Sequence, residues 1–418
     1  MEILNRRGFH WAWIILAVSF FNVAVCYSIR LGFGTIFPVM IPYLSLTRIE
    51  GSTIINFHLA VYICLTPLMG NLTDRFGARW IIALFCIVLG TGTFLMGTVD
   101  HFWSAFFLFG LVGAGASAMW IPVLTVVQRW FAPRRRGMAL GILCTGVGLG
   151  IASIGLFFPI LVEFFSWRFC WYVLGVSALI LALFNGTFIR NNPEDLDMSP
   201  WGKEGHEFLN NVDKRPSAYG GRYREIFHSY RFWTIGASYF FLSCAHFMIT
   251  TFLVDYANAE LGFSFKEASF LVTIRGLSQV VGVLTIPPLS DRIGRKLALI
   301  ITNMSIALSI LGIIVSAKEP LLLSASVVFL SIFLGAVWPL YGACGGDYFR
   351  KEIIGTVLGA WTPFYGLGGI SAHFVGGGIW DITQSYRVAF YLATLSALVA
   401  SILMLILKRP GENGKKEF

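Results

Sequence analysis

Long apolar runs separated by short polar stretches make up most of this 418-residue chain. A helix that crosses the hydrocarbon layer of a membrane, about 30 Å thick, needs about 20 predominantly apolar residues. Runs of this kind predict an all-α membrane protein with twelve transmembrane helices. The predicted spans are residues 11–37, 53–72, 79–98, 102–127, 137–162, 168–189, 231–254, 268–289, 297–316, 321–345, 354–378 and 388–407.

One polar stretch is much longer than the others and divides the predicted spans into two groups of six. It runs from Arg190 to Tyr230 and is rich in Asn, Glu, Asp, Lys and Gly, a composition typical of a loop. We therefore expect an N-terminal six-helix bundle at 1–189, a cytoplasmic linker at 190–230 and a C-terminal six-helix bundle at 231–418.

The two halves share motifs at a nearly constant offset. The stretch Gly70–Arg79 resembles Ser290–Lys296, and Gly137–Gly141 resembles Gly355–Gly359. Three aromatic positions are repeated as well: Trp120, Trp130 and Phe131 correspond to Trp338, Tyr348 and Phe349. Parallel repeats are an architecture of secondary transporters, which bind substrate near the middle of the membrane between the repeats. The repeat therefore predicts a protein that moves a solute.

Basic residues are distributed unequally between the two sides of the predicted membrane. Of the 31 Lys and Arg residues, 24 lie at the termini, in the even-numbered loops or in the central linker, and five lie in odd-numbered loops. Because Lys and Arg accumulate in cytoplasmic loops, we expect a multi-pass protein of the cell membrane with both termini in the cytoplasm. The net charge of +9 then reflects topology, and a nucleic-acid partner is not expected.

The composition fits a membrane protein without a metal site. Hydrophobic residues make up 56% of the chain and charged residues 13%, which is too apolar for an ordinary soluble protein. The seven cysteines are scattered singly and show no CxxC spacing, so they favour neither a zinc site nor a disulfide framework. We expect no cofactor and no metal, and a monomer in contact with the lipid bilayer.

Two basic residues, Arg30 and Arg275, lie inside predicted spans. A charge at the centre of a span costs about 2.5–3.5 kcal/mol on insertion scales and is usually functional. All 22 acidic residues lie in loops or at span ends, with Glu163, Asp255 and Asp347 nearest to the membrane. Arginine binds carboxylate or phosphate through two parallel hydrogen bonds. We therefore predict that both arginines bind an anion; the alternative is that an arginine reaches the membrane surface or helix carbonyls.

Polar and small residues at helical spacing accompany the arginines. Ser278, Gln279 and Gly282 follow Arg275 on one face, and Tyr27 precedes Arg30 by one turn. In span seven, one face carries Tyr239, Ser243, His246 and Thr250. We expect these faces to line a water-filled path.

The internal repeat places a histidine near each arginine position. His58 lies where the second half has Arg275, and Arg30 aligns beside His246. Histidine titrates near physiological pH. We predict that His58 and His246 donate hydrogen bonds to the anion or titrate, with packing as the alternative role.

Aromatic residues and prolines complete the candidates within the spans. The predicted aromatic walls of the site are Tyr27, Tyr239, Trp120, Trp338, Tyr341, Trp361 and Tyr365, with core packing as the alternative. Pro122, Pro339 and Pro363 are expected to weaken spans four, ten and eleven where these must bend.

The duplicated loop resembles the signature loop of the major facilitator superfamily. Its Gly-x-x-x-Asp-Arg-x-Gly-x-Arg pattern stands at Gly70–Arg79, and span count, linker and topology extend the resemblance over the whole chain. The resemblance implies the major facilitator fold, with two pseudo-symmetric six-helix bundles. In that family the loop holds the cytoplasmic side closed, which implies gating roles for Asp74, Arg75 and Arg79 and for the second copy, Asp291, Arg292 and Arg295. Pro287 replaces the glycine of the second copy.

A second, narrower resemblance is to monocarboxylate porters and the related oxalate–formate antiporters. The stretch Arg129–Gly141 is similar to their span-five entry motif, and Trp11-Ala12-Trp13 partly matches their span-one motif. These porters also carry an arginine in span eight, as Arg275 does, often with an aspartate one turn earlier, where this chain has Leu271. The missing acid argues against proton coupling through an Asp–Arg pair.

These observations predict a secondary active transporter of a small organic anion, a mono- or dicarboxylate, working by alternating access with proton symport or anion exchange. An organic phosphate or a sugar acid is the alternative substrate class. A membrane enzyme would need a buried nucleophile–base or metal constellation, and a non-transporting sensor would carry an appended soluble domain. The sequence suggests neither, so we do not expect an enzyme.

Overall fold

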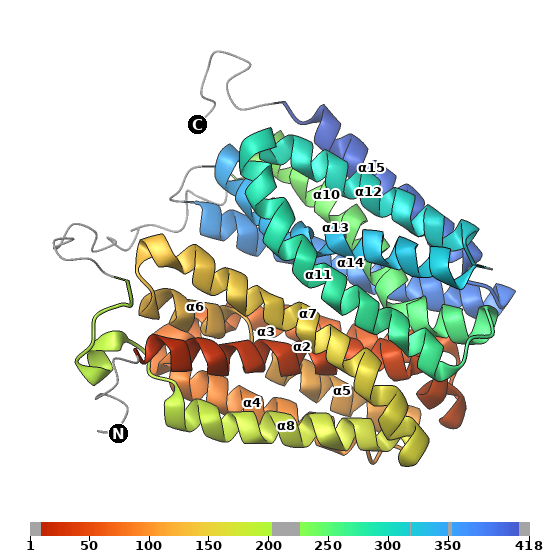
Figure 1. Cartoon of the computed structure of the whole chain (residues 1–418), viewed down its shortest axis with the longest axis horizontal. Helices are drawn as coiled ribbons and strands as arrows, with labels where there is room; N and C mark the ends of the chain where they lie inside the picture. The colour runs from red at the N-terminus through yellow and green to blue at the C-terminus, as the bar shows by residue number, and fades with distance from the viewer. Residues whose placement is uncertain (1–9, 203–225, 318, 350–352, 409–418) are drawn as a thin grey trace. The chain divides into compact units, whose positions relative to one another are not determined.

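The computed structural model describes residues 10–202, 226–317, 319–349 and 353–408, and these segments are almost entirely helical (Figure 1). The helices are α2 (Ala12–Tyr43), α3 (Arg48–Phe76), α4 (Ala78–Met96), α5 (Phe102–Ala116), α6 (Ile121–Trp130), α7 (Pro133–Phe164), α8 (Trp167–Phe188), α10 (Tyr230–Asp255), α11 (Phe265–Ile293), α12 (Arg295–Val315), α13 (Pro320–Tyr348), α14 (Ile354–Thr383) and α15 (Arg387–Ile406). A short 3₁₀ helix, η1 (Pro193–Leu196), follows α8, and a π-helical turn, η2 (Tyr256–Glu260), extends α10.

The helices occupy the twelve predicted spans. Within the described residues, eleven helical segments are long and apolar enough to cross a membrane. The remaining predicted span, 354–378, is occupied by α14, a helix of 30 residues. The all-α membrane fold predicted from the apolar runs is therefore confirmed.

One predicted span differs from the structure in its continuity. The span predicted at 102–127 is divided between α5, which ends at Ala116, and α6, which begins at Ile121. Pro122 lies at the start of α6, where a proline is tolerated because its missing N–H would have no partner in the helix. Pro339 and Pro363 instead lie inside α13 and α14, which continue past them.

The chain forms two compact units. Unit 1 comprises Met1–Phe33 and Phe57–Val212, and unit 2 comprises Gly34–Asn56 and Asp213–Phe418. The segment Gly34–Asn56 contains the end of α2 and the beginning of α3, so these two helices each contribute to both units. Residues 203–225 of the predicted linker lie outside the described residues.

Small residues allow the helices within each unit to pack closely. In unit 1, a Cβ atom on Gly150 of α7 would collide with the carbonyl group of Ala24 on α2. In unit 2, a Cβ atom on Gly282 of α11 would collide with the carbonyl group of Ile332 on α13. Helices in membranes associate through such small residues because lipid offers no hydrophobic driving force for packing.

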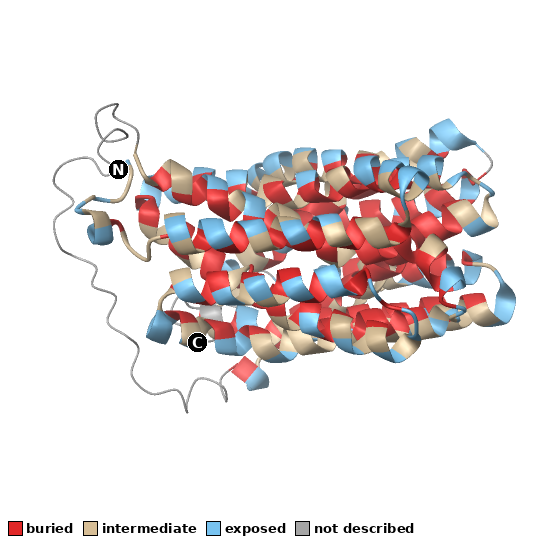
Figure 2. Ribbon diagram, turned by 90° about the horizontal axis from the view of Figure 1, so that it is seen from below, coloured by how far each residue is buried: buried red, intermediate tan, exposed pale blue. Residues whose placement is uncertain are grey.

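Large apolar side chains remain exposed on the outer faces of the helices. Trp103, Leu183, Val315 and Leu321 are exposed by 60%, 71%, 77% and 83%. Figure 2 shows exposed positions along the outward sides of the helices and buried positions facing their neighbours. Exposed apolar surface of this extent marks a membrane surface.

The described beginning of the linker is attached to unit 1. The backbone N–H of Trp201 donates to the carbonyl of Trp130 at 2.9 Å, and the N–H of Ala132 donates to the carbonyl of Trp201 at 3.0 Å. The Trp201 ring also packs edge-on against Trp13, with centroids 5.0 Å apart. This segment therefore fastens the loop between α6 and α7 to the beginning of α2.

Candidate functional site

Arg275 is a buried cation within a membrane-spanning helix. It lies in α11 with 3% of its surface exposed. Its Nη1 donates to the backbone carbonyl of Thr250 on α10 at 3.2 Å. Among the described residues, no carboxylate forms an ion pair with its guanidinium. A buried charge is costly unless it is compensated, so this side chain is suited to receive an anion.

The polar face predicted for span seven contacts Arg275 through Thr250. The Thr250 hydroxyl is buried and has no hydrogen-bond partner within the described part of the chain. His246 lies one helical turn earlier on α10, and its Nδ1 is 2.6 Å from the hydroxyl of Tyr365 on α14. Within one helical turn, α10 therefore contacts Arg275 of α11 through Thr250 and Tyr365 of α14 through His246.

Aromatic residues of α13 and α14 gather around Tyr239 of α10. Its ring centroid lies 4.5 Å from that of Tyr341, 4.7 Å from Tyr365 and 6.0 Å from Trp338. Ser243, one turn further along α10, donates to the backbone carbonyl of Tyr365. The structure therefore brings together six predicted site residues of unit 2: Tyr239, Ser243, His246, Trp338, Tyr341 and Tyr365.

Two of the predicted aromatic residues have contacts that suit packing. The Tyr341 hydroxyl lies 2.7 Å from the Ser238 hydroxyl and accepts a hydrogen bond from Asn303 at 3.2 Å. Trp361 is 1% exposed and donates its indole N–H to the carbonyl of Phe232 at 3.0 Å. These bonds fix both side chains within unit 2.

Arg30 in unit 1 is surrounded by tyrosine rings. Its guanidinium carbon lies 4.8 Å from the ring centroid of Tyr62 and 6.0 Å from that of Tyr27. Tyr27 in turn packs edge-on against Trp120 at 6.1 Å. A guanidinium over an aromatic face is stabilised by the ring quadrupole, so these rings favour the charged form of Arg30. Tyr62 was not predicted as a site residue.

His58 contacts helix α5 within unit 1. Its Nδ1 lies 3.2 Å from the carbonyl oxygen of Phe109, and its ring stacks on the Phe109 ring at 4.5 Å. The side chain is 2% exposed. These contacts favour the packing alternative for His58.

The predicted gating loop of unit 1 carries an ion pair and a helix-end contact. Asp74 lies 3.5 Å from Arg129 at the end of α6. Arg79 donates through its guanidinium to the carbonyl of Gly186 near the end of α8, and Arg75 lies over the ring of Phe76. Between α3 and α4, Gly77 has a φ of +81°, a conformation that favours glycine.

The second copy of the loop reproduces this pattern with exchanged charges. Gly294 has a φ of +90°, and Lys296, the counterpart of Arg79, donates to the carbonyl of Leu405 near the end of α15 at 3.1 Å. The counterpart of Arg129 is Asp347, which pairs with Arg295 at 2.7 Å. Arg295 also pairs with Asp291 at 3.1 Å.

Arg292, the remaining predicted gating residue of the second loop, is exposed. Of the two loops, the predicted residues Asp74, Arg79, Asp291 and Arg295 are thus engaged with the ends of neighbouring helices or with one another.

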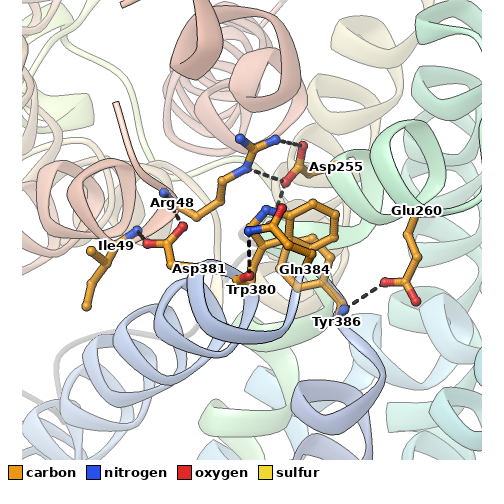
Figure 3. Close-up of polar contacts among 8 residues, drawn as sticks. All are labelled: Arg48, Ile49, Asp255, Glu260, Trp380, Asp381, Gln384 and Tyr386. Atoms are coloured by element: carbon orange, nitrogen blue, oxygen red, sulfur yellow. Dashed lines mark hydrogen bonds and ion pairs between the residues drawn. The ribbon is translucent and has the colours of Figure 1, made fainter. Parts of the chain in front are cut away.

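A buried charge cluster at the beginning of α3 was not predicted as a site (Figure 3). The guanidinium of Arg48 donates from Nε and Nη2 to the two carboxylate oxygens of Asp255, each at 3.2 Å. Asp255 is 0% exposed and also accepts a hydrogen bond from the Tyr386 hydroxyl. Burial and the adjacent Asp255 carboxylate raise the pKa of Tyr386 well above its ordinary value, so the hydroxyl remains a donor.

The sequence predicts Arg48 to be a loop residue, because it lies outside the apolar run of its helix. The signal for the cluster was nevertheless present as a spacing of four between Arg48, Ser52 and Asn56, which places these polar residues on one helical face.

The long apolar helices are those of a multi-pass membrane protein. The sequence matches the family model of the Major Facilitator Superfamily over residues 12–265 and 235–418. The chain belongs to this superfamily, and it is accordingly a transporter and not an enzyme. The fold and family predicted from the duplicated loop are confirmed.

Several known proteins resemble the chain over most of its length. Monocarboxylate transporter 13 of Bos taurus is 24% identical over 405 residues, which cover 95% of this chain and 89% of that protein. A probable hexose phosphate transport protein of Chlamydia pneumoniae is 20% identical and covers 97% of this chain and 92% of its own length. A solved bacterial homologue of the human lysosomal transporter Spinster, inward-facing and occupied, has a TM-score of 0.70 at 15% identity, covering 94% and 96% of the two chains.

Proposed function

We propose that this transporter carries a small organic anion, a mono- or dicarboxylate, by alternating access. The observation that supports the proposal best is the buried guanidinium of Arg275, which has no carboxylate partner among the described residues. An incoming carboxylate would supply the missing charge and accept two parallel hydrogen bonds from the planar fork.

Residues near Arg275 would fix the orientation of the anion. The Thr250 hydroxyl, buried beside the carbonyl that Arg275 contacts, is a further hydrogen-bonding group. His246, one turn away on α10, forms a polar pair with Tyr365 of α14, and Tyr239 and Trp338 add apolar surface. A few polar groups in an aromatic-lined pocket are typical of sites for small molecules.

Arg30 is the second anion-binding group in the proposal. The rings of Tyr62 and Tyr27 stabilise its charge within unit 1.

The resemblance to named transporters supports the class of substrate. The name of monocarboxylate transporter 13 gives its substrate class as monocarboxylates, and that protein aligns with 95% of this chain. An organic phosphate remains the second candidate, because the hexose phosphate relative aligns with 97% of the chain and arginine also binds phosphate bidentately.

A binding screen with the purified full-length protein tests the proposal. The panel contains lactate, pyruvate, oxalate, glucose 6-phosphate and inorganic phosphate, with thermal stabilisation as the readout because a ligand of the folded state raises its stability. Stabilisation by carboxylates that is lost in Arg275→Gln supports the proposal. Stabilisation by glucose 6-phosphate alone supports the second candidate, and stabilisation by none of the anions overturns both.

The proposed site implies roles for the loops and the membrane. We propose that Asp74, Arg75 and Arg79 in unit 1 and Asp291, Arg292 and Arg295 in unit 2 are gating residues. The ion pairs and helix-end contacts that Asp74, Arg79, Asp291 and Arg295 make within their own units support this role. The unequal distribution of Lys and Arg supports a cell membrane location with both termini in the cytoplasm.

A further inference from the structure

We propose that unit 1 binds an anionic phospholipid on its membrane-facing surface, where the beginning of α4 meets the end of α8. Two arginines at this place, Arg79 and Arg190, bind the lipid phosphate, and exposed apolar side chains of the same two helices contact its acyl chains. None of the residues proposed to bind the transported anion belongs to this lipid site. The inference therefore does not depend on which anion is carried.

The guanidinium groups of Arg79 and Arg190 meet at the last turn of α8. Arg79 donates from Nε to the carbonyl of Gly186 at 2.8 Å. Arg190 donates from Nη1 to the carbonyls of Thr187 and Ile189 at 2.8 and 2.9 Å. The last carbonyls of a helix have no partner inside the helix, and this end of the helix favours positive charge. The end of α8 therefore holds two cationic side chains in one place.

No ion pair neutralises these two cations. Within the described part of the chain, neither Arg79 nor Arg190 lies within ion-pairing distance of a carboxylate. Partial burial and the charge of Arg79 lower the pKa of Arg190, and Asp195 acts in the opposite direction. The Asp195 carboxylate itself accepts a hydrogen bond from the backbone N–H of Asn192 at 3.1 Å. A phosphate, which arginine binds through its planar fork, offsets the repulsion between the two cations.

Trp80 marks the level of the lipid headgroups. It follows Arg79 at the beginning of α4, and the Arg79 guanidinium carbon lies 4.8 Å from its ring centroid. The Trp80 side chain is 60% exposed. Tryptophan is enriched at the interface between membrane and water, where its ring lies among the headgroups. The neighbouring arginine is therefore at the depth of a lipid phosphate.

Helices α4 and α8 lie side by side below the two arginines (Figure 1). A Cβ atom on Gly90 of α4 would lie 3.0 Å from the carbonyl oxygen of Gly175 on α8. The Cys86 thiol lies 3.2 Å from the carbonyl oxygen of Ala178. Because the helices touch along these positions, their opposite sides are left for the membrane.

Apolar side chains extend from the arginines along the membrane-facing sides of both helices. On α4, Leu84 and Ile87 follow Trp80 at intervals of four and three residues, and both are exposed. On α8, Ile180 and Leu183 are exposed as well. Residues at intervals of three and four share one helical face. A lipid whose phosphate binds the arginines can therefore lay its acyl chains along these faces.

The internal repeat preserves the pair of basic residues. Lys296 at the beginning of α12 and Lys408 after α15 stand 217 and 218 positions after Arg79 and Arg190. Lys296 donates to the carbonyl of Leu405 near the end of α15 at 3.1 Å. Each unit thus carries a second cation beside the one that contacts the helix end. This repetition supports a role for the second cation beyond capping the helix.

A phospholipid suits this place better than a free phosphate ion does. A free ion would contact only the arginines, whereas a lipid also covers the exposed apolar faces beside them. Basic pockets between transmembrane helices bind anionic headgroups, and each arginine near the membrane surface raises the affinity about fivefold. The charge and the apolar surface together therefore favour an anionic lipid.

Fluorescence quenching at Leu183 tests the proposal. Leu183→Cys is made in the full-length chain with the native cysteines replaced by alanine, and it is labelled with a nitrobenzoxadiazole fluorophore. Position 183 lies about 10 Å along the helix from Arg190, at the depth of the acyl chains. The protein is reconstituted into phosphatidylcholine vesicles that contain a minor fraction of phosphatidylglycerol or phosphatidylcholine with a nitroxide on the acyl chain. We expect the phosphatidylglycerol to quench several-fold more effectively, because the site enriches it.

The other end of α8 provides a matched control position. Val173→Cys lies near Arg168, which also lies over a tryptophan ring but forms an ion pair with Asp100 at 2.6 Å. Because that arginine is already neutralised, the two nitroxide lipids should quench a fluorophore at position 173 equally.

Charge variants then assign the preference to the two arginines. Arg190→Gln should reduce the preference for phosphatidylglycerol at position 183 about fivefold, and Arg79→Gln combined with Arg190→Gln should abolish it. Arg190→Lys, which keeps the charge, should retain most of it. Arg168→Gln should leave it unchanged.

Three outcomes would overturn the proposal. The first is equal quenching by the two lipids at position 183 in the protein with both arginines, a result that needs no charge variant. The second is an unchanged preference in the double variant. The third is loss of the preference on addition of millimolar inorganic phosphate but not of sodium chloride at the same ionic strength, which would show that the arginines bind free phosphate instead of a lipid.

Discussion

Arg275 of α11 donates to the backbone carbonyl of Thr250 on α10, one helical turn after His246. A carbonyl dipole stabilises a guanidinium less than a carboxylate does, since hydrogen bonds between two ionised groups are the strong ones. The contact therefore holds the side chain in place while leaving its charge uncompensated by any described carboxylate. We therefore expect both Arg275 and Arg30 of unit 1 to contribute to anion binding.

Replacing Arg275 by glutamine should remove anion binding and preserve the fold. A hydrogen bond to a charged group contributes about 1.5–3 kcal/mol, so affinity for the carboxylate found in the screen should fall at least about tenfold. Arg275→Lys, which keeps the charge but loses the planar fork, should bind with intermediate affinity. Calorimetric titration measures both variants. Arg387→Gln is the control, because that arginine is 60% exposed. Unchanged affinity in Arg275→Gln would exclude this residue from the site.

Arg30→Gln should weaken binding of the same carboxylate to a similar extent, about 1.5 kcal/mol or more. Tyr62→Leu should have a smaller effect, about 0.5–1 kcal/mol, since it removes the aromatic ring next to the guanidinium and keeps the cation. Titration of both variants and of Tyr43→Leu, a tyrosine exposed by 64%, gives the comparison. A dicarboxylate that loses affinity in Arg275→Gln but not in Arg30→Gln would show that one arginine suffices.

Asp74→Asn should shift the balance between inward-open and outward-open states without changing ligand chemistry. The Asp74–Arg129 pair is largely exposed, and exposed pairs contribute about 0.2–1 kcal/mol, so the shift in population should be at most about fivefold. Labelling of cysteines introduced at each end of the helices measures the shift. A labelling pattern that stays unchanged while affinity is lost would contradict the gating role.

Proton symport through His246 predicts a specific uptake pattern. An anion at Arg275 would bring the counter-charge that an imidazolium needs inside a membrane, so anion and proton should enter together. Uptake of lactate or oxalate into vesicles should rise with an inward proton gradient, and His246→Ala should abolish this rise. Tyr365→Phe, which removes the described partner of His246, should weaken it. Stimulation by substrate preloaded inside the vesicles, independent of pH, would establish exchange instead.

Gly377→Val should loosen segment Gly34–Asn56, because its side chain would collide with Ser52 and with the backbone of Arg48. Gly378→Val is the matched control, since a Cβ atom there would lie at an ordinary distance of 3.7 Å from Ile49. Hydrogen–deuterium exchange of peptides from this segment should be faster in Gly377→Val than in Gly378→Val. Equal exchange in the two variants would show that the contact at Gly377 does not hold the segment.

Hydropathy predicted the helices well, but it misplaced their charged ends. The second span was predicted to begin at residue 53, whereas α3 begins at Arg48. Arg48 and Glu50 lowered the hydropathy of residues 48–52. The cap that stabilises this first turn comes from Asp381, 333 positions away. The break between α5 and α6 was likewise obscured, because the chain stays apolar through Ala118, Met119 and Trp120.

The candidate site was predictable to the extent that it depends on charge within apolar runs. Arg275 and Arg30 stood out because they interrupt such runs, and helical spacing found the face that carries Thr250 and His246. The partnership of Arg48 with Asp255 was not predictable, because 207 residues separate them and each looked like a loop residue. Helical spacing also could not distinguish Tyr239, which lies among the rings of the candidate site, from Trp361, whose indole N–H is bonded to the carbonyl of Phe232.

The exchange of charge between the two loop regions has a consequence for how the halves can be recombined. Unit 1 joins an acidic loop residue, Asp74, to a basic helix end, Arg129, whereas unit 2 joins a basic loop residue, Arg295, to an acidic helix end, Asp347. Grafting residues 129–131 of the first half onto the second would place Arg129 opposite Arg295, and the reverse graft would place Asp347 opposite Asp74. The two halves share the same loop motif, but the acidic and basic partners of the ion pair are exchanged between them. Each loop therefore needs the helix end of its own half.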